Sequence, residues 1–229
     1  MQSSCTLVMD TSSSPLLLAL EKEGKLYTAR RKGIKQEKLL FPVLCKLLGQ
    51  AEAQLSDISR ILIVRGPGRF TGIRIALTFA SMMQMLNKTQ VRGVTLFEVL
   101  RAQVTAGRAF QKWQAQNPTG VLAVILHAFR EEYFLQIFDS KHRGPQWLSR
   151  EELLAQLASY PSALFLAGTD KAFAPLDELV GPLYFLAPYK ECCVQPGMLV
   201  QLSRDKRWAD HALEPLYLKP ARFELIVPK

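Results

Sequence analysis

"VRGPGRFTGIRIAL", residues 64–77, joins an apolar strand to a long apolar helix through a loop with three glycines and one proline. The loop is not a Walker A phosphate loop, because no Gly-Lys-Ser or Gly-Lys-Thr follows it. It is not a dinucleotide fingerprint either, because Gly66, Gly68 and Gly72 are spaced differently from GxGxxG. Backbone amides ahead of a helix attract anions, but glycines also serve tight strand-to-helix turns. The loop sequence leaves both interpretations open.

The segments around this loop alternate between strands and helices. Strands are predicted at 5–10, twice within 15–31, at 58–66 and at the start of 91–107, and helices within 35–54, from 73 to 86 and at the end of 91–107. The two strands of 15–31 meet at a tight Glu23-Gly24 turn. Pro42 is expected near the first turn of its helix, where a missing N–H costs least.

The helix after the glycine loop has very little polar surface. Thr71 is its expected N-cap residue. Between 73 and 86 the polar side chains form one narrow stripe of Arg74, Thr78, Ser81 and Gln84. A helix of this kind buries most of its circumference. One apolar face can pack on its own sheet, and the other is expected to need a second partner.

The second half of the chain repeats the pattern. Strands are predicted at 121–129, 132–139, 163–170 and 183–188, and helices at 149–160 and 196–208. Ser149 and Glu152 form a capping-box signature. Residues 107–120 are polar and broken by Asn-Pro and Gly, so one domain is expected at 1–107 and a smaller one at 119–229, whose tail can pack back on the first. The chain is therefore expected to be α/β, with two similar halves.

The chain of 229 residues has a formal net charge of +9. Its Lys and Arg residues cluster at 30–38, 140–144 and 203–208. A polyanion such as RNA is one explanation, and a solvated surface is the other. No basic motif interleaved with aromatic residues separates the two explanations.

The cysteines and the apolar segments indicate a cytoplasmic protein. The four cysteines show no CxxC spacing, and the adjacent Cys192 and Cys193 suit neither a structural disulfide nor a zinc knuckle. A reducing cytosol is the simplest setting. The start of the chain lacks the basic leader of a signal peptide, and no apolar stretch is long enough to cross a bilayer.

Motifs for chemistry are sparse. In "MDTSSS", residues 9–14, Asp10 could face a nucleotide phosphate through its metal, or it could cap its own turn. "GTD" at 168–170 is a possible phosphate-facing turn or a plain αβ turn. The three histidines form neither HxxxH nor HExxH, and no GxSxG elbow is present, which disfavours a peptidase or an esterase.

Three segments in this order resemble the TsaB family, formerly YeaZ: "MDTSSSPLLLAL" at 9–20, "GPGRFTGIRIAL" at 66–77 and "EPLYLK" at 214–219. The resemblance implies the ASKHA fold (actin-like and ribonuclease H-like), with two related α/β halves and mixed sheets. It also implies a role in making threonylcarbamoyladenosine next to the anticodon of ANN-decoding tRNAs, at position 37.

The resemblance implies a non-catalytic subunit that binds and stabilises the catalytic TsaD. TsaE would be a third subunit, a second copy of the chain an alternative partner, and tRNA would be contacted through the complex. No metal and no cofactor of its own are expected, with ATP or ADP at the complex interface. A vestigial nucleotide site would include Asp10, Thr11, Gly66 and Gly68.

The same resemblance places the pairing surface on the helix after the glycine loop and on the preceding helix. The residues expected there are Leu40, Val43, Leu44, Leu47, Ile73, Arg74, Leu77, Ala80, Ser81 and Gln84. Departures from the family pattern are Arg69 in place of a small serine, Gln36 and Glu37 in place of a histidine-containing segment, and "HAFREEYF" at 127–134. The alternative is a small ASKHA-type phosphotransferase or ATPase that uses Asp10 and the loop.

Overall fold

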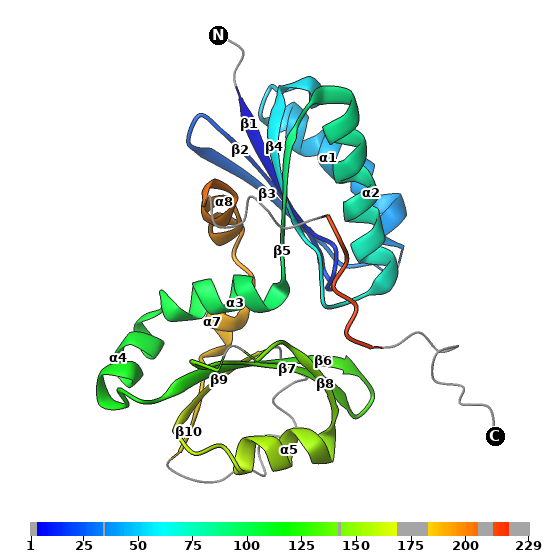
Figure 1. The fold of residues 1–229 in the computed structure, drawn as a ribbon. Helices are drawn as coiled ribbons and strands as arrows, with labels where there is room; N and C mark the ends of the chain where they lie inside the picture. The colour runs from blue at the N-terminus through cyan, green and yellow to red at the C-terminus, as the bar shows by residue number, and fades with distance from the viewer. Residues whose placement is uncertain (1–3, 34, 142, 169–182, 206–212, 220–229) are drawn as a thin grey trace, which may run out of the picture. The chain divides into compact units, whose positions relative to one another are not determined.

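The computed structural model describes residues 4–33, 35–141, 143–168, 183–205 and 213–219. The chain divides into two units (Figure 1). Unit 1 comprises Met1–Val99 and Gln195–Leu216, and unit 2 comprises Leu100–Val194 and Tyr217–Lys229. In the described part of the chain, no helix is long and apolar enough to cross a membrane.

Unit 1 is built on a mixed sheet in the order β3-β2-β1-β4-β5. Its strands are β1 (Cys5–Asp10), β2 (Leu16–Lys22), β3 (Lys25–Arg31), β4 (Ile58–Val64) and β5 (Gln90–Val94). The first three strands pair antiparallel, whereas β1, β4 and β5 pair parallel. Glu23 and Gly24 have φ values of 53° and 79°, as expected for a two-residue hairpin turn that needs positive φ. The predicted hairpin is confirmed.

Helices cover both faces of this sheet. α1 (Gln36–Gln50) and α2 (Phe70–Asn87) lie side by side on one face, and α8 (Pro196–Arg204) packs on β1, β2 and β4 on the other (Figure 1). A short 3-10 helix, η1 (Leu55–Asp57), precedes β4. Arg92, on β5, donates hydrogen bonds from one guanidinium nitrogen to Ser203 O at 2.8 Å and to Asp205 O at 2.9 Å. These bonds satisfy carbonyl groups at the end of α8.

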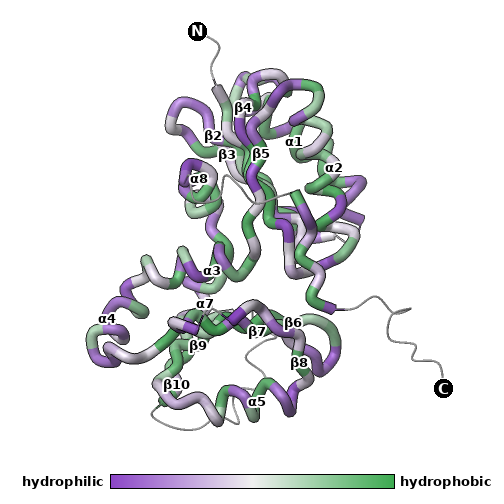
Figure 2. The backbone as a smooth tube through the Cα atoms, viewed as in Figure 1, coloured by the Kyte–Doolittle hydropathy of each residue, from purple (hydrophilic) through white to green (hydrophobic). Residues whose placement is uncertain are grey.

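Unit 2 repeats the strand topology of unit 1. Its sheet has the order β10-β9-β6-β7-β8, with strands β6 (Val121–Phe129), β7 (Glu132–Phe138), β8 (Gln146–Ser149), β9 (Leu164–Gly168) and β10 (Tyr184–Leu186). The first strand is again central, with an antiparallel hairpin on one side and parallel strands on the other. The backbone of β9 and β10 is coloured as hydrophobic in Figure 2. The predicted pair of related α/β halves is confirmed.

The helices of unit 2 also lie on two faces. α5 (Arg150–Ala158) covers one face through Leu153 and Leu157. Its predicted capping box is present, since Glu152 N donates to Ser149 Oγ and Ser149 N donates to a Glu152 carboxylate oxygen. On the other face, rings of Phe110 and Trp113 from α4 (Arg108–Gln116) contact Phe165 edge-on. Two further helices of the described residues are α3 (Leu96–Thr105), which spans the boundary between the units, and α7 (Tyr189–Cys192).

The division into units differs from the predicted domain boundary. Residues 107–120, predicted as a polar break, contain α4, because the 7% exposed Trp113 packs into unit 2. The boundary falls inside α3, and 195–216 belong to unit 1. The tail contacts unit 1 where Leu216 N donates to Arg65 O at 2.8 Å. The strand β8 was not predicted from the sequence.

Two smaller expectations about helices were wrong. Pro42 lies at the seventh position of α1, not in its first turn, and its ring is on the exposed face. The N-cap residue of α2 is Arg69, so Thr71 is already helical. Arg69 N donates a hydrogen bond to Ser12 O, and the helix begins two residues before the predicted position.

Candidate partner surface and glycine-rich loop

The glycine loop packs directly on the turn after β1. Arg69 N donates to Ser12 O at 2.7 Å, and Thr11 Oγ1 donates to Gly72 O at 2.6 Å. A Cβ on Gly68 would lie 2.3 Å from Ser12 O, and one on Gly72 would lie 1.9 Å from Thr11 O. No side chain fits at these distances, so the two glycines permit a close approach of two backbone segments.

Gly66 has a related role at the other end of the loop. Its φ is 120°, and a Cβ there would lie 2.7 Å from Leu216 O. Gly66 O accepts a hydrogen bond from Leu96 N at 2.7 Å, at the start of α3. The peptide bond between Gly66 and Pro67 is cis. The loop thus links β4, α2 and the tail segment of unit 1.

The carboxylate of Asp10 is used within its own turn. One of its oxygens accepts from Ser12 N at 2.9 Å and from Ser12 Oγ at 2.6 Å, and the other accepts from Ser13 Oγ at 2.8 Å. Asp10 is 1% exposed and Thr11 is 0% exposed. Of the two interpretations left open for Asp10, this arrangement is the turn cap, and the carboxylate does not face solvent.

Gln36, the first residue of α1, ties this helix to the same turn. Its side-chain nitrogen donates to Ser13 O at 2.8 Å, and the residue is 2% exposed. Its side-chain oxygen is buried and has no hydrogen-bond partner. The four residues of the predicted nucleotide site, Asp10, Thr11, Gly66 and Gly68, therefore belong to a packed junction. In the sequence, Gln36 stands out only as a departure from the family pattern, and its contact with the turn was not predicted.

Seven of the ten residues predicted to contact a partner lie in the core of unit 1. They are 9% exposed or less: Leu40, Val43, Leu44, Leu47, Ile73, Leu77 and Ala80. The prediction is wrong for these residues, because each helix turns its apolar stripe toward its own sheet and toward the neighbouring helix. Arg74 and Gln84 are exposed and Ser81 is partly exposed, so partner contact stays a prediction for these three.

The second apolar face of α2 is covered in part by α1. The ring of Phe41, on α1, meets the ring of Phe79, on α2, edge-on with 6.0 Å between the centroids. Phe79 is 3% exposed, whereas Phe41 is 51% exposed. The need for a partner inferred from the sequence is thus met partly within the chain.

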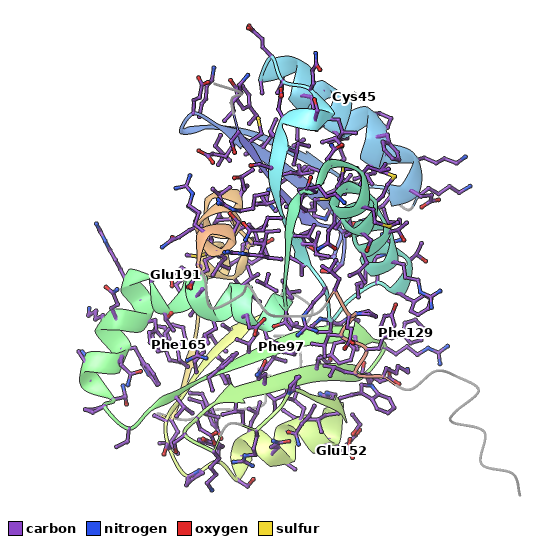
Figure 3. All side chains as sticks on the ribbon, turned by 45° about the horizontal axis from the view of Figure 1, so that its top comes forward. Cys45, Phe97, Phe129, Glu152, Phe165 and Glu191 are labelled. Atoms are coloured by element: carbon purple, nitrogen blue, oxygen red, sulfur yellow. The ribbon has the colours of Figure 1, made fainter. Side chains whose placement is uncertain are left out.

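Large apolar side chains nevertheless remain on the outer side of these helices. Phe70 is 51% exposed, Leu86 72% and Met85 75%. The Arg74 guanidinium lies 3.9 Å from the centre of the Phe70 ring. The exposed Cys45 lies on α1, one turn after Phe41, and Figure 3 labels it there. We call this set the α1–α2 surface: Phe41, Cys45, Phe70, Arg74, Met85 and Leu86. A helical-wheel plot could have indicated this surface, because it separates the residues of each helix that face the core from those on the opposite side.

The described residues contain no group of three or more His, Cys, Asp and Glu side chains placed to hold a metal ion. His127, on β6, lies 2.8 Å through its Nε2 from Arg130 O. The other two histidines, His142 and His211, lie outside the described residues, as do Thr169 and Asp170 of the "GTD" segment.

Comparisons with known proteins support the resemblance seen in the sequence. Residues 34–135 match the family model TsaD, described as tRNA N6-adenosine threonylcarbamoyltransferase. The tRNA threonylcarbamoyladenosine biosynthesis protein TsaB of Bacillus subtilis is 24% identical over 229 residues, which cover 95% of this chain and 95% of that protein. The chain is thus similar to proteins of the TsaB family. The TsaB protein of Haemophilus influenzae is 27% identical over 179 residues, 76% of this chain and 72% of the relative.

A solved structure shows the same fold. YeaZ from Pseudomonas aeruginosa is 21% identical, covers 94% of this chain and 100% of its own, and superposes with a TM-score of 0.63. The predicted α/β fold with two mixed sheets is thereby confirmed as the fold of YeaZ. The relatives from Bacillus subtilis and Haemophilus influenzae are both tRNA threonylcarbamoyladenosine biosynthesis proteins.

Proposed function

We propose that this chain is a non-catalytic subunit that pairs with the TsaD-type transferase through the α1–α2 surface and stabilises it. The observation that carries the proposal is the exposure of Phe41, Phe70, Met85 and Leu86 on two adjacent helices. Neighbouring exposed apolar side chains mark protein interaction sites. The surface mixes aromatic, Met and Arg side chains, which are enriched at interfaces.

The match to the TsaD family model supports a pairing of related folds. The matched residues, 34–135, include both helices of the α1–α2 surface. Two chains that share this part of the fold can associate through equivalent helices, as in an isologous dimer. The same surface would serve a homodimer when the transferase is absent, and TsaE would join the mixed complex elsewhere. This assembly acts in the cytoplasm and reaches tRNA as a complex.

The absence of a catalytic role is supported by the use of Asp10 in its own turn. A phosphotransferase or ATPase of this fold would need that carboxylate to face a nucleotide and its metal. Here the carboxylate accepts hydrogen bonds from Ser12 and Ser13 and is 1% exposed. Any ATP or ADP would then bind at the interface with the transferase, without a complete site on this chain.

The test is co-expression with the TsaD of the same organism, followed by size-exclusion chromatography with light scattering. Cys45 can serve as a chemical probe, because it is exposed on α1, one turn after Phe41. Alkylation with N-ethylmaleimide, followed by mass spectrometry, should slow at Cys45 by tenfold or more in the complex. Cys193, which is partly exposed on unit 2, is the internal control and should react at an unchanged rate.

Two results would overturn the proposal. One is a mixed complex in which Cys45 stays as reactive as in the chain alone. The other is a chain that ignores TsaD and hydrolyses nucleotide, with turnover abolished by Asp10→Asn, which would favour the phosphotransferase alternative.

A further inference from the structure

Positive charge concentrates where β3 passes into α1. Arg31 ends β3, Lys32 follows it, Lys35 is the N-cap residue of α1, and Lys38 lies in the first turn. All four residues are exposed. We call them the β3–α1 basic surface. Among the described residues, β3 is the edge strand of its sheet, and no further strand pairs with it on this side.

The charges of this surface are not neutralised within the described residues. The ion pairs found there join Arg143 to Asp139, Arg150 to Glu131, Arg204 to Glu21 and Lys219 to Glu132. Lys32, Lys35 and Lys38 take part in none of them. Arg31 donates one guanidinium hydrogen bond, at 2.8 Å, to the backbone oxygen of the preceding residue. Glu37 is the single acidic residue between positions 25 and 38.

Local stability does not account for these cations. Charged residues on an edge strand protect it from pairing with other chains, which explains Arg31 but not the lysines beyond the strand. At the N-terminus of a helix, the helix dipole disfavours positive charge. Lys35 makes no side-chain capping bond, and Lys38 sits in the same first turn. Both lysines therefore work against the helix that they begin.

We propose that the β3–α1 basic surface contacts the phosphate backbone of the tRNA that is modified. The inference rests on the proposed function, because it takes the RNA partner from the role of the chain in tRNA modification. Lys and Arg side chains bind phosphates and so position a nucleic acid without reading its sequence. The formal net charge of +9 favours an RNA over a basic or neutral partner.

The position of the surface fits this role. Lys38 precedes Phe41 by three residues, so the two side chains are neighbours on one side of α1. The β3–α1 basic surface thus borders the α1–α2 surface. An RNA held by these lysines runs alongside the bound transferase and adds contacts that the transferase alone lacks.

The test compares two charge-removing triple variants in the full chain. Arg31→Ala/Lys32→Ala/Lys35→Ala removes most of the basic surface and leaves Lys38 beside the partner surface. The probe is an unmodified, fluorescein-labelled transcript of a tRNA that decodes an ANN codon. Anisotropy titrations between 50 and 200 mM KCl give the affinity and its salt dependence, for the chain alone and for its complex with TsaD.

The matched control removes the same charge from unit 2, in Arg108→Ala/Lys112→Ala/Lys141→Ala, whose residues are also exposed. With about 0.7–0.9 counterions released per phosphate contact, the basic-surface variant should lower the slope of log affinity against log salt by about 2. Its affinity at 100 mM KCl should fall about tenfold or more. The control variant should change both quantities far less.

The outcomes separate this inference from the proposed function. If no TsaD complex forms with the wild-type chain but the basic-surface variant still loses tRNA affinity, the RNA contact is supported and the proposed pairing is overturned. A normal TsaD complex with equal tRNA binding by wild type, test and control variants overturns the RNA contact alone. So does a test variant that keeps its tRNA affinity but loses TsaD, because the surface would then bind an acidic protein.

Discussion

The backbone amide of Arg69 donates a 2.7 Å hydrogen bond to the carbonyl oxygen of Ser12. This bond joins the loop before α2 to the turn after β1, two segments that are 57 positions apart in the chain, counted as 69 − 12. The contact depends on Gly68, whose missing side chain lets the two backbones approach. The loop therefore fixes the start of α2 against the turn after β1. This contact accounts for Gly68 as a residue that permits a close backbone approach.

Gly68→Ala should destabilise unit 1. The new Cβ would lie 2.3 Å from Ser12 O, at a φ of 157° that side chains rarely adopt, so the junction must open. Steric strain of this kind costs about 1–3 kcal/mol. Urea unfolding of the isolated chain measures the loss of stability. Gly49→Ala is the control, because a Cβ there meets nothing within 4 Å on α1 and Ala favours a helix by about 1 kcal/mol. Equal effects of the two substitutions would contradict the packing role.

Leu44→Ala should reduce the stability of the isolated chain and not merely its pairing. Leu44 is 1% exposed in the core of unit 1, and truncating a buried Leu costs about 2–5 kcal/mol. The adjacent Cys45 is exposed, so Cys45→Ala should change the free energy of unfolding by less than about 0.5 kcal/mol. Denaturant titration of both variants is the measurement. If Leu44→Ala unfolded like wild type, the position of α1 on its sheet would be wrong.

Met85→Glu should weaken the complex with TsaD and leave the fold intact. Met85 is 75% exposed, so the isolated chain gains no buried charge. In the complex, an unpaired carboxylate at an apolar contact costs about 2 kcal/mol or more, which is about a thirtyfold loss of affinity. Binding is measured by surface plasmon resonance on immobilised TsaD. The control is Phe129→Glu on unit 2, where the side chain is 53% exposed and pairing should be unaffected.

Tyr160→Phe should change how the stability of the chain depends on acid. Burial alone would raise the pKa of Asp139, but hydrogen bonds from Tyr160 Oη, Lys141 N and the Arg143 guanidinium lower it below its ordinary value. Asp139 therefore stabilises the fold above its unfolded pKa of about 3.9, and this stabilisation is lost as pH falls through the lower folded pKa.

The variant lacks the Tyr160 hydroxyl and should lose less stability on acidification. The two unfolding free energies should differ by a constant amount between pH 5 and 7 and converge below about pH 4. Denaturant titrations at a series of pH values measure this. Curves that stay parallel down to pH 2 would show that the hydroxyl does not stabilise the carboxylate.

Much of the fold could be predicted from short-range pattern. The Glu23-Gly24 turn and the Ser149–Glu152 capping box rely on residues within four positions of each other, so their energies depend little on the rest of the chain. Helical spacing also placed α1, α2 and α5. The turn cap at Asp10 was one of two alternatives, because its serine partners are local but its burial is not.

Long-range packing determined which surfaces the predicted helices bury, which the local patterns could not predict. The periodicity of α1 predicts an apolar stripe through Leu44 that must be buried. It does not indicate whether the chain's own sheet or a partner protein covers the stripe. In the folded chain that surface is its own sheet, and the partner-facing side chains are those opposite the stripe, such as Phe41. In the same way, α8 was recognisable as a helix, but its place on the first sheet depends on contacts such as that of Arg92 with Ser203, 111 residues away. Local sequence specifies which segments form helices and strands, whereas the free energy of burying their apolar faces depends on partners that only the complete packed chain brings together.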